Sequence, residues 1–248
     1  MKVAVLGAEG RMGSETCRAV DAAEDLALVA RIGRGGNLDE ATSAGAEVVV
    51  DFTEPRSVMA NIAAALDRKL NIVVGTSGFD EERLGEVKTL TDGAPGVGCI
   101  IAPNFAIGAV LMVKFAREAS RYFDSAEIVE THHNRKLDAP SGTAIYTARE
   151  IAAARAAAGR GPSPDATTVS MPGARGASVD DVPIHALRLA GAVAHQEVVL
   201  GGPGEILTIR HDSLDRAAFM PGVLLAVRSV ADRPGLTVGI EALLGLDG

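Results

Sequence analysis

Roughly the first hundred residues alternate short apolar runs with helical patterns, and this alternation constrains the fold more than any other feature of the sequence. The apolar runs predict strands at 2–6, 26–32, 48–52, 71–74 and 99–102, and the segments between them predict helices at 14–23, 57–68 and 81–90. Strands that are buried on both faces are nearly continuous in apolar residues, and helices connect parallel neighbours. The sequence therefore predicts an α/β fold with a parallel sheet that helices cover on both faces.

After about residue 106 the pattern changes. A helix is expected over 107–122, a strand of mixed polarity over 125–131 and an alanine-rich helix over 142–158. Three alternating segments at 184–189, 193–200 and 205–210 are separated by glycine-rich turns, which predicts an antiparallel meander. A helix over 214–230 and a strand over 236–240 then resume the first pattern. We interpret this as a nucleotide-binding domain, 1–106 and 216–248, interrupted by an α+β domain over 107–215.

The charge and composition exclude several classes of partner. The chain of 248 residues carries a net charge of −8, which argues against nucleic acid or an anionic membrane as the main partner. The sequence enters a strand pattern directly, and no apolar run approaches the ~20 residues that span a bilayer. We therefore expect a cytoplasmic protein. Cys17 and Cys99 form neither a disulfide framework nor a metal-binding spacing.

A glycine-rich turn, Gly7-x-x-Gly10-x-x-Gly13, follows the first predicted strand and opens a helix. Glycines there allow a tight turn and let backbone N–H groups approach a pyrophosphate at the helix N-terminus. A purely structural turn is the alternative. Further turns follow the fourth and fifth strands at 75–77 and 102–105, and the carboxyl ends of strands are where open α/β sheets bind ligands.

The end of the second strand bears on which nicotinamide cofactor binds. A carboxylate there would accept a hydrogen bond from a ribose 2′-hydroxyl, whereas arginine suits a 2′-phosphate. The chain has no carboxylate after this strand until Asp39, and it has Arg31 and Arg34. We therefore expect NADPH to be used at least as well as NADH, with Arg34 the better candidate for the phosphate contact, while Arg31 equally fits a solvated strand residue.

The segment from residue 127 to 144 concentrates the polar chemistry of the chain. His132, His133 and Lys136 lie within five residues, and Ser141-Gly142-Thr143 follows as the start of a helix. Histidine titrates near neutral pH and suits proton donation to a carbanion, and Lys136 supplies a fixed positive charge. The N–H groups and hydroxyls at the helix start can hold a carboxylate.

Simpler interpretations remain for each member of this segment. A histidine here could be structural, and Pro140-Ser141 could be no more than a helix start. Two adjacent histidines are poor metal-binding geometry, and no cysteine cluster accompanies them, so no metal is expected.

The spacing Glu127-x-x-Glu130-x-His132-His133-x-x-Lys136-x-Asp138-x-Pro140-Ser141-Gly142-Thr143-Ala144 resembles the signature of the 4-hydroxy-tetrahydrodipicolinate reductase family, also called dihydrodipicolinate reductase. The resemblance continues through 102–105, 172–176 and 210–216, and so extends over essentially the whole chain. It implies a Rossmann-type nucleotide-binding domain, an inserted substrate and tetramerisation domain, a homotetramer built through the inserted sheet, and a role in making diaminopimelate and lysine.

The resemblance also implies roles for individual residues. His132 corresponds to the proton donor and Lys136 to the second catalytic group, while His133 and the Gly142-Thr143 pair correspond to the substrate-carboxylate contacts. The implied cofactor contacts are Gly7, Ala8, Glu9, Gly10, Arg11 and Met12, then Gly75, Thr76 and Ser77, then Ala102, Pro103, Asn104 and Phe105. Ser77 stands where the family often has threonine, which preserves the hydroxyl.

The predicted reaction is reduction of a small dicarboxylate by NADPH or NADH, with a proton from His132 and charge stabilisation by Lys136. The alternatives are a non-catalytic NAD(P)-binding sensor and a related dehydrogenase of the aspartate or homoserine type. A sensor would be expected to lose the polar site residues, and the related dehydrogenases do not account for His132-His133-x-x-Lys136.

Overall fold

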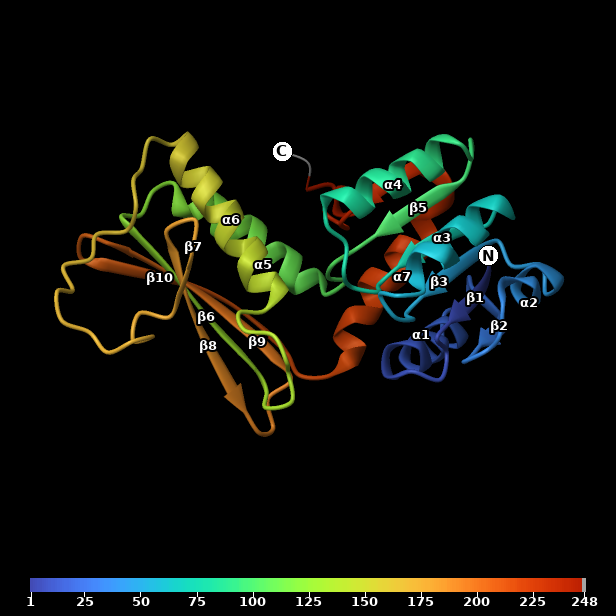
Figure 1. Ribbon diagram of the computed structural model, residues 1–248, viewed down its shortest axis with the longest axis horizontal. Coiled ribbons are helices and arrows are strands. Elements are labelled where there is room, and N and C mark those ends of the chain that lie inside the picture. The colour runs from blue at the N-terminus through green and yellow to red at the C-terminus, as the bar shows by residue number, and fades with distance from the viewer. Residues whose placement is uncertain (247–248) are drawn as a thin grey trace. The chain divides into compact units, whose positions relative to one another are not determined.

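The chain forms two compact units, which the computed structural model describes for residues 1–246 (Figure 1). The first unit comprises Met1–Ile107 and Arg216–Gly248, and the second comprises Gly108–Asp215. Residues 247 and 248, which the sequence analysis assigned to the first domain, lie outside the described residues.

The first unit contains a six-stranded sheet in which every recorded pairing is parallel. In sheet order the strands are β11 (Gly235–Val238), β5 (Gly98–Ile101), β4 (Asn71–Val74), β3 (Val48–Asp51), β1 (Lys2–Leu6) and β2 (Ala27–Ile32). Residues of both parities along the strands are fully buried, for example Val3 and Ala4 in β1, because helices cover both faces. The predicted parallel sheet is confirmed.

Helices of the first unit pack on the two faces of this sheet. They are α1 (Arg11–Asp21), α2 (Leu38–Ser43), α3 (Val58–Asp67), α4 (Glu81–Asp92) and α7 (Met220–Ser229). Side chains of α2, α3 and α4 form one core cluster with Leu6, Val49 and Ile72, while α1 and α7 contact each other. The short helix α2 is absent from the sequence prediction, because six residues with a polar pattern give no helical periodicity.

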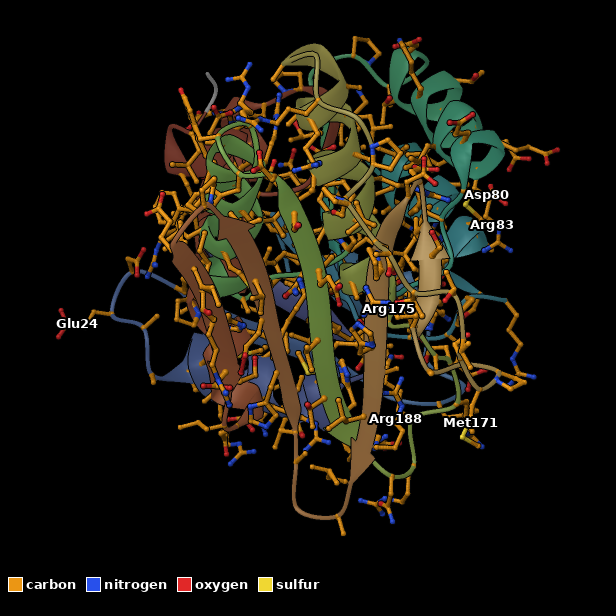
Figure 2. All side chains as sticks on the ribbon, turned by 90° about the vertical axis from the view of Figure 1, so that its left-hand side faces the viewer. Glu24, Asp80, Arg83, Met171, Arg175 and Arg188 are labelled. Carbon is orange, nitrogen blue, oxygen red and sulfur yellow. The ribbon has the colours of Figure 1, made fainter. Side chains whose placement is uncertain are left out.

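The second unit is a five-stranded mixed sheet with two helices. The strands in sheet order are β10 (Glu205–Ser213), β9 (Ala194–Gly202), β6 (Ser125–His133), β8 (Val182–Leu189) and β7 (Ala177–Val179), and the helices are α5 (Ile107–Ser120) and α6 (Gly142–Ala157). Ala116 of α5 and Ala148 of α6 pack with Ile128 and Val198 in one core cluster, so both helices cover the same face. Figure 2 looks onto the opposite face, where no helix lies over the strands.

The predicted antiparallel meander is wrong in its strand order. Strands β9 and β10 pair antiparallel as expected, but β6 lies between β8 and β9 and runs parallel to β8. The cause is that β6 alternates buried Ala126, Ile128 and Glu130 with half-exposed residues and takes the centre of the sheet. The four residues between β8 and β9 therefore cross the end of β6 instead of closing a hairpin.

Several boundaries also differ from the prediction. Strand β6 runs two residues past the predicted end at 131 and includes His132 and His133. The predicted helix 214–230 is divided into a 3₁₀ turn, Arg216–Phe219, and α7. Among the described residues, no helix combines the length and the apolar character needed to cross a membrane.

Candidate active site

The glycine-rich turn of the first unit is built so that only glycine fits at its key positions. Gly7 has φ +73°, and a Cβ there would lie 2.6 Å from the carbonyl oxygen of Phe52. A Cβ at the buried Gly13 would overlap the Gly7 carbonyl. The turn is held by the N–H of Gly7, which donates to the Ile32 carbonyl at 2.9 Å, and by the N–H of Gly10, which donates to Gly7 at 2.9 Å.

Helix α1 begins directly after this turn with its N-terminus open. The cap residue is Gly10, so no side chain accepts a hydrogen bond from the first N–H groups, and the first turn contains no acidic residue. Free N–H groups and the positive end of the helix dipole favour an anion at this position. The predicted contacts Gly7, Ala8, Glu9, Gly10, Arg11 and Met12 all lie in this turn or in the first turn of α1.

Two further predicted turns meet the first at the carboxyl ends of the strands. A Cβ at Gly75, after β4, would overlap the ring of Phe52, which follows β3. The Phe52 ring packs edge-to-face on Phe105 with centroids 6.1 Å apart. The Phe52 backbone lies against Gly7 and the Phe52 ring lies against Gly75, so this residue joins turns that are far apart in sequence. The structure thus brings the segments 7–12, 75–77 and 102–105 to one edge of the sheet.

A fully buried carboxylate, Asp51, organises the turn after β4. Its Oδ1 accepts hydrogen bonds from the Thr53 hydroxyl at 2.6 Å and the Thr76 hydroxyl at 3.0 Å, and its Oδ2 accepts from the Asn61 amide at 2.8 Å. The Thr76 side chain therefore points into the protein, whereas Ser77 is exposed. This network was not foreseen, although an Asp that ends a run of valines is the signal that could have indicated it.

An acidic side chain, that of Glu9 in the glycine-rich turn, lies beside the end of β2. The Glu9 carboxylate lies over Gly33, where a Cβ would be 2.6 Å from Glu9 Cδ. The acidic residue missing from the end of β2 is thus supplied by the glycine-rich turn. Arg34 follows in an exposed position, whereas Arg31 forms an ion pair with Asp21 at 2.5 Å on the surface of the unit. That pair accounts for Arg31 without a ligand and leaves Arg34 as the candidate phosphate contact.

In the second unit, His132 is held by a buried carboxylate. His132 Nδ1 lies 2.6 Å from Glu130 Oε2, and the Glu130 side chain is 0% exposed. The register of β6 with β8 places Arg188 opposite His132, and its guanidinium donates to both Glu130 oxygens at 2.8 and 2.9 Å. The start of α6 supplies a further donor, since the N–H of Ser141 donates to Glu130 Oε1 at 3.0 Å.

The protonation of this cluster follows from its burial and its charges. Burial lowers the pKa of His132 from its ordinary value, with Lys136 and Arg188 adding to the effect, while Glu130 opposes it. Burial alone would raise the pKa of Glu130, but the hydrogen bonds from Arg188 and His132 outweigh it and hold that pKa below its usual value. Glu130 is therefore an ionised carboxylate at neutral pH.

Lys136 lies in the loop that follows β6 and is paired with a neighbour. Its Nζ is 2.9 Å from Asp138 Oδ1, and the Asp138 side chain is 59% exposed. Burial raises the pKa of Asp138, but the hydrogen bond from Lys136 outweighs it, so that the pKa is lowered. His133 ends β6, and its Nδ1 accepts a hydrogen bond from the N–H of Arg135 at 3.2 Å.

The Ser141-Gly142-Thr143 segment starts helix α6. The Ser141 hydroxyl accepts a hydrogen bond from the N–H of Ala144 at 3.2 Å, so this side chain caps the helix and is buried. Gly142 is exposed, and a Cβ there would meet nothing within 4 Å. Within residues 1–246 no group of three or more His, Cys, Asp or Glu side chains is placed to hold a metal ion.

Comparison with known proteins identifies the family of the chain. The family described as dihydrodipicolinate reductase, N-terminus, matches residues 1–105, and the family described as dihydrodipicolinate reductase, C-terminus, matches residues 108–244. The chain belongs to the dihydrodipicolinate reductase family. Membership makes it an oxidoreductase that uses NADH or NADPH, as the glycine-rich turn predicted.

Individual relatives match along the whole chain. The chain is 59% identical to the 4-hydroxy-tetrahydrodipicolinate reductase of Streptomyces griseus, covering 100% of the chain and 99% of the relative, and 56% identical to that of Mycobacterium marinum, covering 99% and 100%. Among solved structures, the dipicolinate-bound dihydrodipicolinate reductase of Paenisporosarcina sp. TG-14 is 37% identical with a TM-score of 0.85, covering 98% of both chains. A probable dehydrogenase from Thermotoga maritima, 12% identical with a TM-score of 0.62, shares the fold.

The first unit of this reductase fits a dinucleotide on its own geometry. Side chains at Gly7 or Gly13 would fill the space in which the turn lies, and the N-terminus of α1 has no internal cap. Both features are required where backbone N–H groups hold a pyrophosphate. The sequence analysis did not assign a role to Asp51, Phe52 or Arg188, because their contacts join strands that are distant along the chain.

Proposed function

We propose that the chain reduces 4-hydroxy-tetrahydrodipicolinate to tetrahydrodipicolinate with loss of water, a step in the biosynthesis of diaminopimelate and lysine. The observation that carries this proposal is the cluster around His132: a buried carboxylate holds one ring nitrogen, and Lys136 and the start of helix α6 follow within a few residues. The names of the full-length relatives and the dipicolinate bound to the Paenisporosarcina enzyme support a ring with two carboxylates as the substrate.

The residues of the second unit account for binding. Dipicolinate-like rings carry two carboxylates, and the second unit offers Lys136, His133 and the N–H groups at Gly142 and Thr143. A carboxylate that binds Lys136 replaces Asp138, an exposed partner, so that the ammonium group keeps a counter-charge throughout. Helix starts and lysine ammonium groups are suited to this task because they combine hydrogen-bond donors with positive charge.

The residues also account for the proton. Bound NADH or NADPH supplies a hydride. A hydride added to the far carbon of a conjugated C=C–C=N system moves the electron pair toward the ring nitrogen, which leaves an enamine whose neighbouring carbon must gain a proton. His132 donates that proton, and Lys136 stabilises the negative charge while it develops. The conjugated system itself forms when the 4-hydroxyl group and a hydrogen of the neighbouring ring carbon leave as water. After hydride and proton are added, the products are the reduced imine and the oxidised cofactor.

The test is oxidation of NADPH measured with freshly generated substrate and, separately, with aspartate semialdehyde alone. We expect turnover only with the first, and we expect His132→Gln and Lys136→Ala to lose most of kcat/KM. Lys88→Ala, which removes an exposed lysine of α4, is the matched control for Lys136→Ala. Cofactor binding without any turnover would favour the sensor, and turnover of the semialdehyde would favour the related dehydrogenases.

The cofactor preference is proposed to depend on two side chains at the end of β2. Arg34 is an exposed cation just after β2 that can contact a 2′-phosphate, and Glu9 can accept a hydrogen bond from a 2′-hydroxyl. We expect Arg34→Ala to weaken NADPH binding and to leave NADH binding almost unchanged, and Glu9→Gln to weaken NADH binding. Dissociation constants from cofactor fluorescence test this without turnover. A strong preference of the unaltered protein for NADH would refute the role of Arg34.

Self-association is proposed to use the sheet of the second unit and to give a homotetramer. Its edge strand β10 carries Ile206, which is 74% exposed, beside the half-exposed Leu207. Exposed apolar residues on a sheet edge favour pairing with another chain. Light scattering during size exclusion should give the mass of four chains, and Ile206→Lys should reduce it. A monomer at all concentrations would contradict the proposal. We also propose a cytoplasmic location, because a biosynthetic reductase draws on the NAD(P)H pool there.

A further inference from the structure

Glu130 is a carboxylate with no exposure to solvent, and its partners are all parts of the second unit's polar cluster. Its two oxygens contact His132 Nδ1, two nitrogens of Arg188 and the N–H of Ser141. A buried carboxylate is costly unless donors of this kind surround it. A leucine or methionine would fill the same space at a lower free-energy cost of burial. The position therefore indicates a task that needs the charge.

Arg188 connects this carboxylate to the loop that carries Lys136. One guanidinium nitrogen, Nη2, donates both to Glu130 Oε1 at 2.9 Å and to the carbonyl oxygen of Asp138 at 2.7 Å. Within residues 1–246, the buried Nε of Arg188 has no hydrogen-bond partner. Figure 2 shows Arg188 near the end of β8, next to the end of β6. One side chain thus holds both the strand of His132 and the loop of Lys136.

The contact with Glu130 determines which nitrogen of His132 carries the proton in the neutral ring. An ionised carboxylate only accepts hydrogen bonds, so Nδ1 must be an N–H donor at 2.6 Å. The other nitrogen, Nε2, is then the one that gains and loses a proton. A carboxylate beside a histidine orients the ring and stabilises its cation in the same way in Ser-His-Asp hydrolases.

We propose that Glu130 and Arg188 act as a positioning pair for His132: Glu130 fixes the Nδ1–H form and supports the imidazolium, and Arg188 takes up part of the charge of Glu130 so that His132 can release its proton. This inference rests on the proposed role of His132 as the proton donor.

The charges around His132 act in opposite directions. Glu130 favours the imidazolium, whereas Arg188 in β8 and Lys136 in the following loop disfavour it. The facing strand β9 places Ala194 opposite His132 and the uncharged Gln196 opposite Glu130, and the first turn of α6 contains no acidic residue. The two members of the pair should therefore shift the pKa of His132 with opposite signs when they are replaced.

The first experiment uses the unaltered protein with ¹⁵N-labelled histidine. Long-range ¹H–¹⁵N spectra above the pKa of His132 should show a protonated Nδ1 and an unprotonated Nε2, with the signal assigned by its absence in His132→Gln. A neutral ring protonated at Nε2, or an even mixture of the two forms, would overturn the proposal. This measurement needs no variant of Glu130 to fold.

The second experiment follows the pKa of His132 in variants. Glu130→Gln should lower it and Arg188→Gln should raise it, while Arg188→Lys, which keeps the charge, should leave it near the value of the unaltered protein. Glu197→Gln is the matched control, because Glu197 lies in β9 on the opposite face of the sheet and pairs with Arg210. Equal shifts in the same direction for Glu130→Gln and Arg188→Gln would show a purely structural role and refute the pair.

Kinetics separates this inference from the proposed function. Glu130→Gln should lower kcat roughly 100-fold, within the range for general acid catalysis, with a smaller change in the KM for NADPH. Arg188→Lys, which keeps the charge but not the forked contacts to Glu130 and Asp138, should lose less activity than Arg188→Gln. If the proposed function is wrong, no variant turns over the substrate and the NMR results are unchanged. If the pair is wrong, the unaltered protein turns over the substrate and the opposite pKa shifts are missing.

Discussion

Strand β6 carries two glutamates with the same kinds of partner on its two faces, and they differ mainly in burial. On the face covered by α5 and α6, Glu130 binds His132 and Arg188 and is fully buried. On the uncovered face, Glu127 binds His185 at 2.7 Å and also Arg175, and its side chain is 30% exposed. Figure 2 shows Arg175 over this second face.

Burial changes what the same three residue types can do. In both sets the hydrogen bonds from arginine and histidine outweigh burial and hold the glutamate pKa below its usual value. In the exposed set, which is Glu127 with His185 and Arg175, water can replace any partner that leaves, so the contacts are weak and exchangeable. In the buried set no such replacement exists, and the ring of His132 keeps one orientation. The single orientation of the His132 ring fits the role proposed for it as the proton donor.

Replacing the histidine of each set should give the largest difference. We expect His132→Gln to lower kcat/KM by roughly 10²- to 10⁴-fold, because the proton donor is lost. His185→Gln makes the same chemical change on the neighbouring strand and should leave kcat/KM within about threefold, since it removes only an exposed ion pair. Steady-state NADPH oxidation measures both variants. Equal losses in the two variants would remove the distinction between the faces.

Replacing the glutamate of each set should change stability unequally. Glu130→Ala leaves the Arg188 cation and the His132 ring without their buried partner, which should cost about 3–5 kcal/mol in the free energy of unfolding. Glu127→Ala should cost about 1 kcal/mol or less. Urea unfolding at one protein concentration gives both values. A cost for Glu127→Ala as large as that for Glu130→Ala would contradict the assignment of burial as the cause.

The pH dependence of kcat/KM should report His132 and should not respond to the exposed set. A proton donor is active when protonated, so activity falls as pH rises through its pKa. Burial lowers the pKa of His132 from its ordinary 6.5, so the fall should begin below that value in the free enzyme. Above the pKa of His132, kcat/KM should fall about tenfold for each further pH unit. Glu127→Gln should leave the profile in place, and a profile that moves with Glu127 would argue against His132.

Local patterns of the sequence were sufficient for the parallel sheet of the first unit. Continuous apolar runs indicate burial on both sides. In β6 the structure buries Ile128 and Glu130 on one face, a burial that the mixed polarity of the segment did not indicate. A buried glutamate needs a hydrogen-bonding partner. The partner could not be identified, because Arg188 lies 58 residues away and its position depends on β8 pairing with β6.

The prediction of the strand order in the second unit was wrong for the same physical reason, because strand order depends on pairing between segments that are distant in sequence. Turn residues after β8 indicate that the chain reverses there, but they do not say whether another strand lies in between. The carboxylate at the end of β2 was also missed, because Glu9 reaches Gly33 from a different turn. In the site itself, residue types and spacing indicated His132 and Lys136, whereas the links that hold them, through Glu130 and Arg188, depend on tertiary contacts.

Replacing the aspartate that pairs with a cation on each face of the second unit's sheet should have the smallest effect on kcat and KM. Asp138 binds Lys136, and Asp165 binds Arg175 at 3.0 Å. Since a substrate carboxylate must replace Asp138 at Lys136, Asp138→Asn should lower the substrate KM about two- to fivefold, the equivalent of a surface ion pair, with kcat nearly unchanged. Asp165→Asn should alter neither constant, because its arginine serves the uncovered face. If Asp138→Asn instead raises KM, then Asp138 positions Lys136 for the substrate and does not compete with it.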